Sequence, residues 1–258
     1  MNQVSTQQLA DWLDATLQAQ RFRDYCPNGL QVEGKSAVRH IITGVTATQA
    51  LLETAIERGA DAILVHHGWF WKNEDPCVRG PKRKRLSLAL RHDLNIFAYH
   101  LPLDAHPVLG NNAQLARVLG FQPERDEHGN PVTCGPDGLV WLGRCEPAKT
   151  LDELGNSICN ALQRRPLLVG NTQQAIRRIA WCTGGAQSMM KAAVDAGADA
   201  YLTGEASEPT FHLARETGTA FIGAGHHATE RYGVQALGQA VADEFGIKVE
   251  FVDIDNPI

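Results

Sequence analysis

The sequence lacks the features that mark membrane, secreted or disulfide-rich proteins. It has no stretch near the roughly 18 apolar residues that a membrane-spanning helix needs. The first twenty residues have no basic segment followed by an apolar run, so we expect no secretory signal. The six cysteines are scattered and form no Cys-x-x-Cys pair, which argues against a disulfide framework. We therefore expect a reduced, cytoplasmic protein that does not engage a membrane.

The sequence also lacks an excess of charge of one sign. It has 24 Lys and Arg against 29 Asp and Glu, and the net charge is -5. This balance argues against non-specific electrostatic binding of nucleic acid. The hydrophobic content of 43% and charged content of 21% are ordinary for a globular chain with a buried core. The length of 258 residues fits one large domain or two modest ones.

An internal repeat favours two domains. Residues 38–65 align with residues 176–203 without a gap, at a constant offset of 138 residues. The run Gly-Ala-Asp-Ala occurs at 59–62 and again at 197–200. Each copy is typical of a strand, an amphipathic helix that ends at a glycine in the left-handed conformation, and a second buried strand. We predict an α/β fold with an internal duplication, in which two similar three-layer lobes flank a cleft.

The similarity extends outward from the repeat. Capping-box patterns open a predicted helix at Ser5 and another at Thr150. Further helices, near 83–92 and 208–217, lead to strands at 95–100 and 219–223. Strands that alternate with helices predict mainly parallel sheets covered on both faces. Residues 122–136 are rich in proline, glycine and charge and form the predicted linker, so we expect lobes at 1–125 and 126–258.

Histidines and carboxylates follow the predicted strands of both lobes. Ligand sites in open α/β sheets lie beyond the carboxyl ends of the strands, so these side chains converge if the two copies face each other. Five nitrogen and oxygen donors without a thiolate suggest two metal ions that share a carboxylate. We predict a dinuclear metal site in the cleft between the lobes, with the ligands His66, His67, Asp104, His226 and a bridging Glu230.

Imidazole and carboxylate ligands suit Zn, Mn, Fe, Ni or Co, and the sequence does not choose among these metals. A single histidine after a strand is more often hydrogen-bonded than metal-bound, so the prediction depends on convergence. The histidines outside these segments are expected to be solvated or paired with neighbours; they are His40, His92, His128 and His212.

Five segments resemble the signature motifs of a known family. They are NGLQVEG at 28–34, AILVHHG at 62–68, AYHLPLD at 98–104, TGE at 203–205 and GHHATE at 225–230. The sequence resembles the Nif-three-like family, also called GTP cyclohydrolase 1 type 2 homologues, and the match to its short bacterial YbgI type is close. The resemblance implies a duplicated α/β fold, a dinuclear metal centre with the same five ligands, and a ring-shaped homohexamer. It places His100 at the centre but does not firmly assign it as a ligand.

The donor set supports chemistry by metal-activated water. We expect a metal-dependent hydrolase that acts on a nucleotide or another phosphorylated or heterocyclic small molecule. His100, Glu205 and His227 are the candidate acid–base residues. The GTP cyclohydrolase label comes from the resemblance alone, because the zinc enzyme of that name binds its metal partly through cysteine. Two alternatives stay open: a non-catalytic metal-binding or regulatory ring protein, and a DNA-binding ring.

Two other sequence features bear on the substrate. Residues 79–85 hold five cations in seven positions. A solvated segment that opens a helix is the favoured interpretation, and attraction of a phosphorylated substrate through Lys82, Arg83 and Arg85 is the alternative. The aromatic triplet at 69–71 either packs within its lobe or walls the cleft and stacks on a base.

Overall fold

Two units make up the chain, of which the computed structural model describes residues 2–258. Unit 1 comprises the residues up to Gly110 together with Gly233–Asp255, and unit 2 comprises Asn111–Tyr232 with Asn256–Ile258. The boundary at Tyr232 falls inside the long helix α9 (His226–Phe245). Among the described residues, none of the helices has the length and apolar character required to cross a membrane.

Unit 1 is built on a five-stranded sheet with the order β14-β4-β5-β6-β2. The first four strands are parallel, and β2 is antiparallel to β6. A small antiparallel pair, β1 with β3, lies outside this sheet. The elements of unit 1 other than α9 are β1 (Val4–Ser5), α1 (Thr6–Leu17), a 3-10 turn (Ala19–Arg21), β2 (Gly29–Val32), β3 (Ala37–Val38), β4 (His40–Thr46), α2 (Gln49–Glu57), β5 (Ala62–His67), α3 (Gly80–Arg91), β6 (Asn95–Ala98), α4 (Leu101–Ala105) and β14 (Lys248–Phe251).

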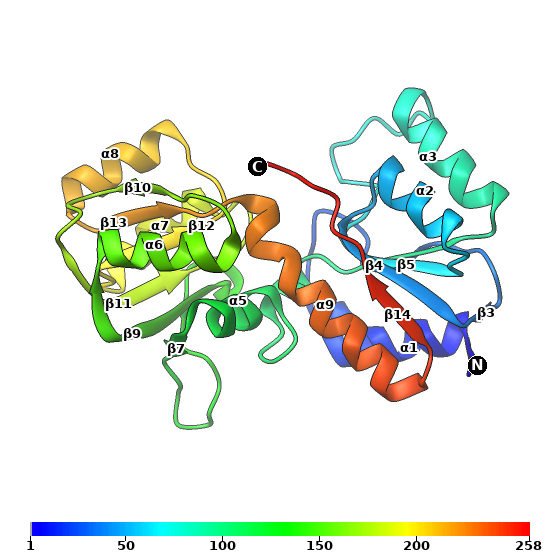
Figure 1. The fold of residues 1–258 in the computed structure, drawn as a ribbon, viewed down its shortest axis with the longest axis horizontal. Helices are drawn as coiled ribbons and strands as arrows, with labels where there is room; N and C mark the ends of the chain where they lie inside the picture. Colours follow the sequence, from blue (N-terminus) through cyan, green and yellow to red (C-terminus); the bar gives the residue numbers. More distant parts are fainter. Residues whose placement is uncertain (1) are drawn as a thin grey trace. The chain divides into compact units, whose positions relative to one another are not determined.

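Helices cover both faces of the unit 1 sheet, as Figure 1 shows for α2 and α3 on one side and α1 and α9 on the other. Successive strand residues point to opposite faces. In β4, Ile41 lies in the core with α1 and α9, and Ile42 lies in the core with α2 and α3. Leu64 and Ile63 of β5 divide in the same way. Unit 1 is therefore a three-layer α/β unit.

Unit 2 is built on a seven-stranded sheet with the order β10-β13-β12-β11-β9-β7, and β8 also pairs with β9. Only β11, β12 and β13 are parallel to one another. The elements of unit 2 other than α9 are α5 (Asn111–Leu119), β7 (Phe121–Pro123), β8 (Thr133–Cys134), a 3-10 turn (Pro136–Gly138), β9 (Val140–Thr150), α6 (Leu151–Leu162), β10 (Leu167–Val169), β11 (Ala175–Trp181), a 3-10 turn (Gln187–Met189), α7 (Met190–Asp195), β12 (Ala200–Thr203), α8 (Glu208–Thr217) and β13 (Ala220–Gly223).

The expectation of mainly parallel sheets holds for unit 1 and is wrong for unit 2. Strands β7, β8, β9 and β10 all pair antiparallel. A short turn joins β8 to β9, and strands joined in this way pair antiparallel. The other antiparallel pairs, such as β10 with β13, join strands that are far apart in the sequence. The unit 2 sheet is nevertheless packed on both faces. Trp141, Trp181 and Ile222 lie in a core with residues of α5 and α6, while α7 contacts β12 and α8 contacts β13.

The unit boundary also differs from the expected division at residue 125. Residues 111–125 belong to unit 2, because Leu115 and Phe121 pack in its core. The segment 233–255 belongs to unit 1, because β14 pairs with β4 and Val241 lies in the unit 1 core. The expected linker at 122–136 instead contains β7, β8 and a turn closed by a bridge between Arg125 and Pro131. Its polar composition matches that turn, which a composition-based prediction cannot distinguish from a linker.

The aligned repeat residues occupy matching positions in the two sheets. Ile41 pairs with Ala62 across β4 and β5, and their counterparts 138 residues later, Ile179 and Ala200, pair across β11 and β12. The helix before the second strand ends near a glycine with positive φ in both units, at Gly59 and Gly197. The expected capping boxes are also present, at Ser5 and Thr150.

One aspartate makes the same backbone hydrogen bonds in each unit. Oδ2 of Asp61 accepts from the backbone N–H groups of Arg39 and His40, at 2.9 and 3.2 Å. Oδ2 of Asp199 accepts from those of Arg177 and Arg178, both at 2.9 Å. Each carboxylate thus holds the start of the first repeat strand beside the start of the second.

Replacing either aspartate should destabilise the protein by a similar amount. We expect Asp61→Ala and Asp199→Ala each to lower the free energy of unfolding by about 1–3 kcal/mol, because each leaves two backbone donors without their acceptor. Urea unfolding at neutral pH measures this. Asp195→Ala is the control, because Asp195 meets Lys191 on the exposed surface of α7, and its loss should cost less than about 0.5 kcal/mol. Equal effects of all three substitutions would contradict the prediction.

Candidate metal centre

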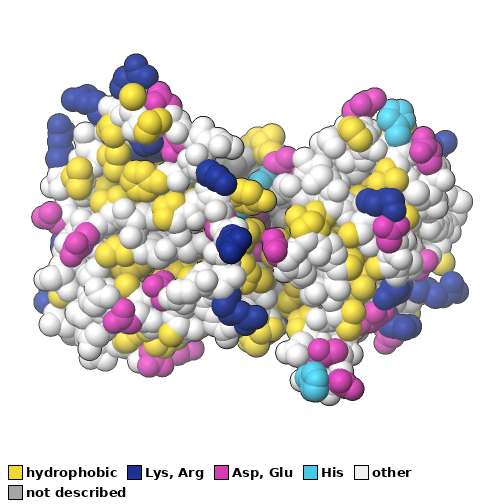
Figure 2. All heavy atoms as spheres, turned by 180° about the vertical axis from the view of Figure 1, so that it is seen from behind, with side chains coloured by type: hydrophobic (Ala, Val, Ile, Leu, Met, Phe, Trp, Pro, Cys, Tyr) yellow, Lys and Arg dark blue, Asp and Glu magenta, His cyan; other side chains and the backbone are white. Residues whose placement is uncertain are grey.

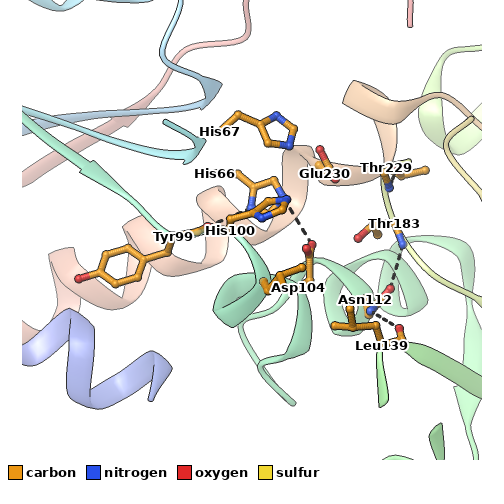
Figure 3. Close-up of polar contacts among 12 residues, drawn as sticks. His66, His67, Tyr99, His100, Asp104, Asn112, Leu139, Thr183, Thr229 and Glu230 are labelled. Atoms are coloured by element: carbon orange, nitrogen blue, oxygen red, sulfur yellow. Dashed lines mark hydrogen bonds and ion pairs between the residues drawn. The ribbon is translucent and has the colours of Figure 1, made fainter. Parts of the chain in front are cut away.

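Three imidazoles gather at the carboxyl ends of two neighbouring strands in unit 1. His66 and His67 are the last residues of β5, and His100 precedes α4, just after β6. The ring of His66 lies 4.5 Å from that of His67 and 5.1 Å from that of His100, measured between centroids. The ligand atoms of the three rings lie within 4.8 Å of one another. The pleat of β5 therefore does not separate its two histidines, and Figure 3 shows the cluster.

Each ring of this cluster is held through its Nδ1 atom. Nδ1 of His66 lies 2.9 Å from the backbone oxygen of Tyr99, and Nδ1 of His67 lies 3.2 Å from Oγ1 of Thr46. Nδ1 of His100 lies 2.7 Å from Oδ1 of Asp24. A histidine bound in this way presents Nε2 to its surroundings, in an orientation set by the neighbour. The cluster is thus built like the ligand set of a metal site.

Asp24, which the sequence reasoning missed, is a fully engaged carboxylate. Besides His100, it accepts hydrogen bonds from Nδ2 of Asn28 and from the backbone N–H groups of Tyr25 and Leu101. Burial raises the pKa of Asp24, but the hydrogen bond and charge of His100, with the other donors, outweigh burial and lower the pKa to about 2. Asp24 is therefore ionised at neutral pH. Nothing in the local sequence distinguishes it from other surface-loop aspartates.

Asp24 and His100 also lie close to a thiol, since their ligand atoms and Sγ of Cys26 lie within 4.8 Å of one another. Burial and the negative charge of Asp24 raise the pKa of Cys26 to about 12. Without a bound metal the sulfur is therefore protonated at neutral pH.

Asp104 completes the unit 1 group. It lies in the short helix α4, is 7% exposed, and its Oδ1 is 3.5 Å from Nε2 of His66. Figure 3 marks this pair with a dashed line. Four predicted site residues therefore lie together in unit 1: His66, His67, His100 and Asp104.

Unit 2 has its own donor group, at the start of α9. His226 is the first residue of that helix, and its Nε2 lies 3.2 Å from Oε2 of Glu230, one turn later. Its Nδ1 lies 2.7 Å from Oε1 of Glu205, which follows β12. Burial lowers the pKa of His226, but Glu230 and Glu205 outweigh it and raise the pKa to about 9. His226 and Glu230 therefore lie on one face of a helical turn.

A glycine loop in unit 2 fits closely around these side chains. A Cβ atom at Gly184 would lie 2.0 Å from Oε1 of Glu230, and one at Gly204 would lie 2.5 Å from the Cα atom of His226. Gly184 also has a φ of +69°, which side chains rarely adopt. Its N–H donates to Oγ1 of Thr229, in the first turn of α9. The sequence reasoning did not single out Gly184, whose role depends on a long-range contact.

The other acid–base candidate in unit 2, His227, is 8% exposed, and its backbone N–H donates to the carbonyl oxygen of Ile258. Of the remaining histidines, His40 pairs with Glu250 at 2.6 Å, His212 with Glu208 at 3.0 Å and His128 with Glu127 at 3.4 Å. These three are paired with neighbours, as expected.

Lys and Arg side chains gather over α3 in unit 1, as Figure 2 shows at the upper left. Two of the three substrate-binding candidates there contact neighbouring residues of unit 1. Lys82 lies over the ring of Phe70 at 5.7 Å and donates to the backbone oxygen of Asp75. The guanidinium of Arg85 lies 5.8 Å from the ring centre of Trp69. Arg83 is exposed. The basic segment 79–85 therefore opens helix α3, in agreement with the favoured interpretation. Two of its residues pack against the aromatic triplet.

The residues of the aromatic triplet have different surroundings. Trp69 is buried in the unit 1 core, and its indole N–H donates to the carbonyl oxygen of Ala47 at 2.9 Å. Trp71 is half-buried and lies edge-on to His100, with ring centroids 5.1 Å apart. Trp69 thus packs within the unit, and Trp71 flanks the imidazole cluster.

Comparisons with known proteins find relatives over almost the whole chain. A model of the family described as Duf34/NIF3 (NGG1p interacting factor 3) matches residues 4–257. Proteins named GTP cyclohydrolase 1 type 2 homolog are 54% identical in Neisseria meningitidis serogroup B, over 95% of this chain and 96% of theirs. In Pseudomonas aeruginosa the identity is 55%, over 98% and 99%. The solved structure of protein ybgI, 46% identical, matches 99% of this chain and 100% of its own with a TM-score of 0.93.

The raised pKa of His226 predicts a pH dependence of stability in the metal-free protein. Since the pKa is about 9 in the folded chain and 6.5 ordinarily, the protonated ring stabilises the fold below pH 6.5. This contribution is lost as the pH rises through about 9. We expect the urea midpoint of wild-type protein in a chelator to fall over this range, and that of His226→Gln to fall less. His212→Gln, which alters an exposed histidine paired with a glutamate, should behave as wild type. Parallel profiles for wild type and His226→Gln would refute the prediction.

Proposed function

Because the chain belongs to the Duf34/NIF3 family, we propose that it is a metal-dependent hydrolase whose centre holds two divalent ions. The proposed ligands are His66, His67 and Asp104 from unit 1, and His226 and a bridging Glu230 from unit 2. The proposed substrate is a nucleotide or another phosphorylated or heterocyclic small molecule, attacked by water that the metal centre activates.

The observation that carries this proposal is the Nδ1 anchoring of every candidate imidazole. His66, His67 and His226 are held by the backbone oxygen of Tyr99, Oγ1 of Thr46 and the carboxylate of Glu205. Metal-binding histidines almost always have such a partner at the second ring nitrogen. Anchored rings in both units therefore support metal binding.

The residues present also fit the proposed metals. Imidazole nitrogen and carboxylate oxygen suit Zn, Mn, Fe, Ni or Co. The glycine at 184 leaves room for the carboxylate of Glu230, which a side chain there would displace. The negative charges of Asp104 and Glu230 offset the charge of bound cations in a region where both carboxylates are largely buried.

A metal centre of this kind supplies Lewis-acid activation of water and of a phosphate or carbonyl oxygen. The chain's own contribution is to orient the ligands and to move protons. Glu205 is engaged with Nδ1 of His226, so we assign it a positioning role there. His227 remains a candidate general base. Of the three candidates Lys82, Arg83 and Arg85, we assign the attraction of a phosphorylated substrate to Arg83, because Lys82 and Arg85 are engaged with Phe70 and Trp69.

Three further predictions accompany the proposal. The matching register and the shared aspartate contacts support an internal duplication, in which the two units derive from one ancestral unit. A ring-shaped homohexamer and a cytoplasmic location follow from the family resemblance and the scattered cysteines. Light scattering coupled to size-exclusion chromatography measures the assembly.

Removing the unit 2 ligands should reduce both metal content and turnover. We expect the double variant His226→Ala, Glu230→Gln to lose one of two bound ions and to lower hydrolysis across a nucleotide panel by at least ~100-fold. Elemental analysis and single-substrate kinetics on metal-loaded protein measure the two effects. The matched control is Glu208→Gln, His212→Ala, because this pair has the same four-residue spacing on the exposed surface of α8.

Equal turnover by wild type and the His226/Glu230 variant would contradict the hydrolase proposal. Two ions per chain in the variant would contradict the ligand set. If the ions bind as expected but no substrate in the panel is hydrolysed, the result favours the alternative hypothesis of a non-catalytic metal-binding protein.

A further inference from the structure

A groove between α2 and α3 of unit 1 lies apart from the proposed metal centre. Its volume is about 300 Å³, and none of the residues that line it belongs to the imidazole cluster. We propose that this groove binds a small molecule through a chain of phosphate groups. The inference goes beyond the proposed function, which uses only Arg83 of the groove, because it assigns a binding site whose occupation needs no metal ion.

Two rows of side chains at four-residue spacing line the groove. Arg83, Ser87 and Arg91 follow one another along α3, where residues four apart lie on the same face of the helix. Gln49 and Glu53 form the second row, on α2. Both helices cover the same face of the unit 1 sheet (Figure 1). The groove is therefore built from packed secondary structure and not from a loop.

The cations of the groove have no negative partner in the protein. Among residues 2–258, no ion pair and no side-chain hydrogen bond involves Arg83, Lys84 or Arg91, all of which are exposed. Other cations of the same helix are engaged. Lys82 pairs with a glutamate at 3.5 Å, and the guanidinium of Arg85 lies over an indole ring. The three groove cations are therefore free to bind an anion.

The stability of α3 does not explain these charges. Arg83 and Lys84 lie near the N-terminus of α3, where positive charge opposes the helix dipole, and the first turn holds no acidic residue. Helix α8 lies between β12 and β13 of unit 2, as α3 lies between β5 and β6, and it also opens with proline. Counted from that proline, α8 has Phe211 and His212 at the positions of the two cations. A helix in this place therefore does not require them.

The length and charge of the groove favour a chain of phosphates. Arg83 and Arg91 are eight residues apart, which is about 12 Å along a helix. A phosphate chain presents oxygen atoms along that length, whereas a single phosphate would draw both side chains to one point. Guanidinium groups bind phosphate oxygens through paired hydrogen bonds. The three cations outnumber the one carboxylate, that of Glu53, which accepts a hydrogen bond from Gln49 at 2.7 Å.

The size of the groove favours a small molecule over nucleic acid. A volume of about 300 Å³ lies at the lower end of the range for small-molecule sites. Proteins that bind nucleic acid by charge contact many phosphates over an extended basic surface, and they are mostly basic overall. This chain has a net charge of -5. The occupant that we assign is therefore a small molecule with a polyphosphate chain.

The test titrates full-length protein, stripped of metal, with inorganic triphosphate at about 0.15 M salt. Isothermal titration calorimetry measures the affinity and the stoichiometry. We expect one triphosphate per chain. The triple variant Arg83→Gln, Lys84→Gln, Arg91→Gln should weaken binding at least ~100-fold, because charge-assisted hydrogen bonds to phosphate are lost.

Two single variants separate a specific site from general attraction by charge. Ser87→Ala should weaken binding by about 3–10-fold, because its hydroxyl group is a neutral donor in the groove and its loss leaves the net charge unchanged. Glu53→Gln should strengthen binding, because it removes the one carboxylate that lines the groove. Glu57→Gln is its control, since Glu57 is exposed on α2 outside the groove.

The matched control for the triple variant is Arg177→Gln, Lys191→Gln, Arg215→Gln. It removes the same charge from exposed positions of unit 2. Since distant exposed charges are screened at this salt concentration, affinity should change less than about twofold. Circular dichroism of each variant checks folding.

The proposal is overturned if triphosphate does not bind, if both triple variants lose affinity equally, or if inorganic phosphate binds as tightly as triphosphate. Binding of duplex DNA but not of triphosphate through the same three cations would overturn it in favour of a nucleic-acid surface. None of these results depends on hydrolysis. A metal-loaded protein that binds triphosphate but hydrolyses no substrate would count against the hydrolase proposal alone.

Discussion

The anchoring of imidazole rings through Nδ1 is the interaction on which the candidate site depends. A histidine side chain rotates about two bonds, and clustered rings repel one another when protonated. Carbonyl, hydroxyl and carboxylate oxygens fix the rings at His66, His67, His100 and His226. Each anchor comes from a different strand or loop, so the sheet of each unit must be correctly formed before its own rings take these orientations. The fold therefore determines how the rings can bind a metal through these Nδ1 hydrogen bonds as much as through the donor atoms themselves.

The two units share the arrangement of their repeat strands but carry different side chains at the ends of these strands. Their repeat strands pair in the same register. In each unit an aspartate also accepts hydrogen bonds from the backbone at the start of the first repeat strand. At the strand exits the residues differ. The position equivalent to His66 is Gly204, where a side chain would collide with the first turn of α9. The position equivalent to His67 is Glu205, which positions His226 instead of supplying an imidazole. Unit 1 thus holds a cluster of rings, and unit 2 holds one ring between two carboxylates.

Much of the fold could be predicted because short-range sequence patterns determine where its helices begin and end. The capping boxes at Ser5 and Thr150, the terminal glycines at 59 and 197 and the helix over 208–217 follow from short-range preferences. The unit boundaries could not be predicted in this way. Residues 111–125 and 233–255 were assigned by position along the chain, yet their membership depends on which core receives Leu115 and Val241.

The sequence by itself determined the donor chemistry: which residues are histidine and carboxylate, that they follow repeat strands, and that no thiolate pattern accompanies them. Only the tertiary structure decided which atoms hold those donors. Asp24 reaches His100 across 76 residues of chain, and Gly184 makes room for Glu230 across 46. Such contacts arise when the strands align and the loops pack over their ends. Their partners are set by three-dimensional proximity, to which spacing along the chain is no guide.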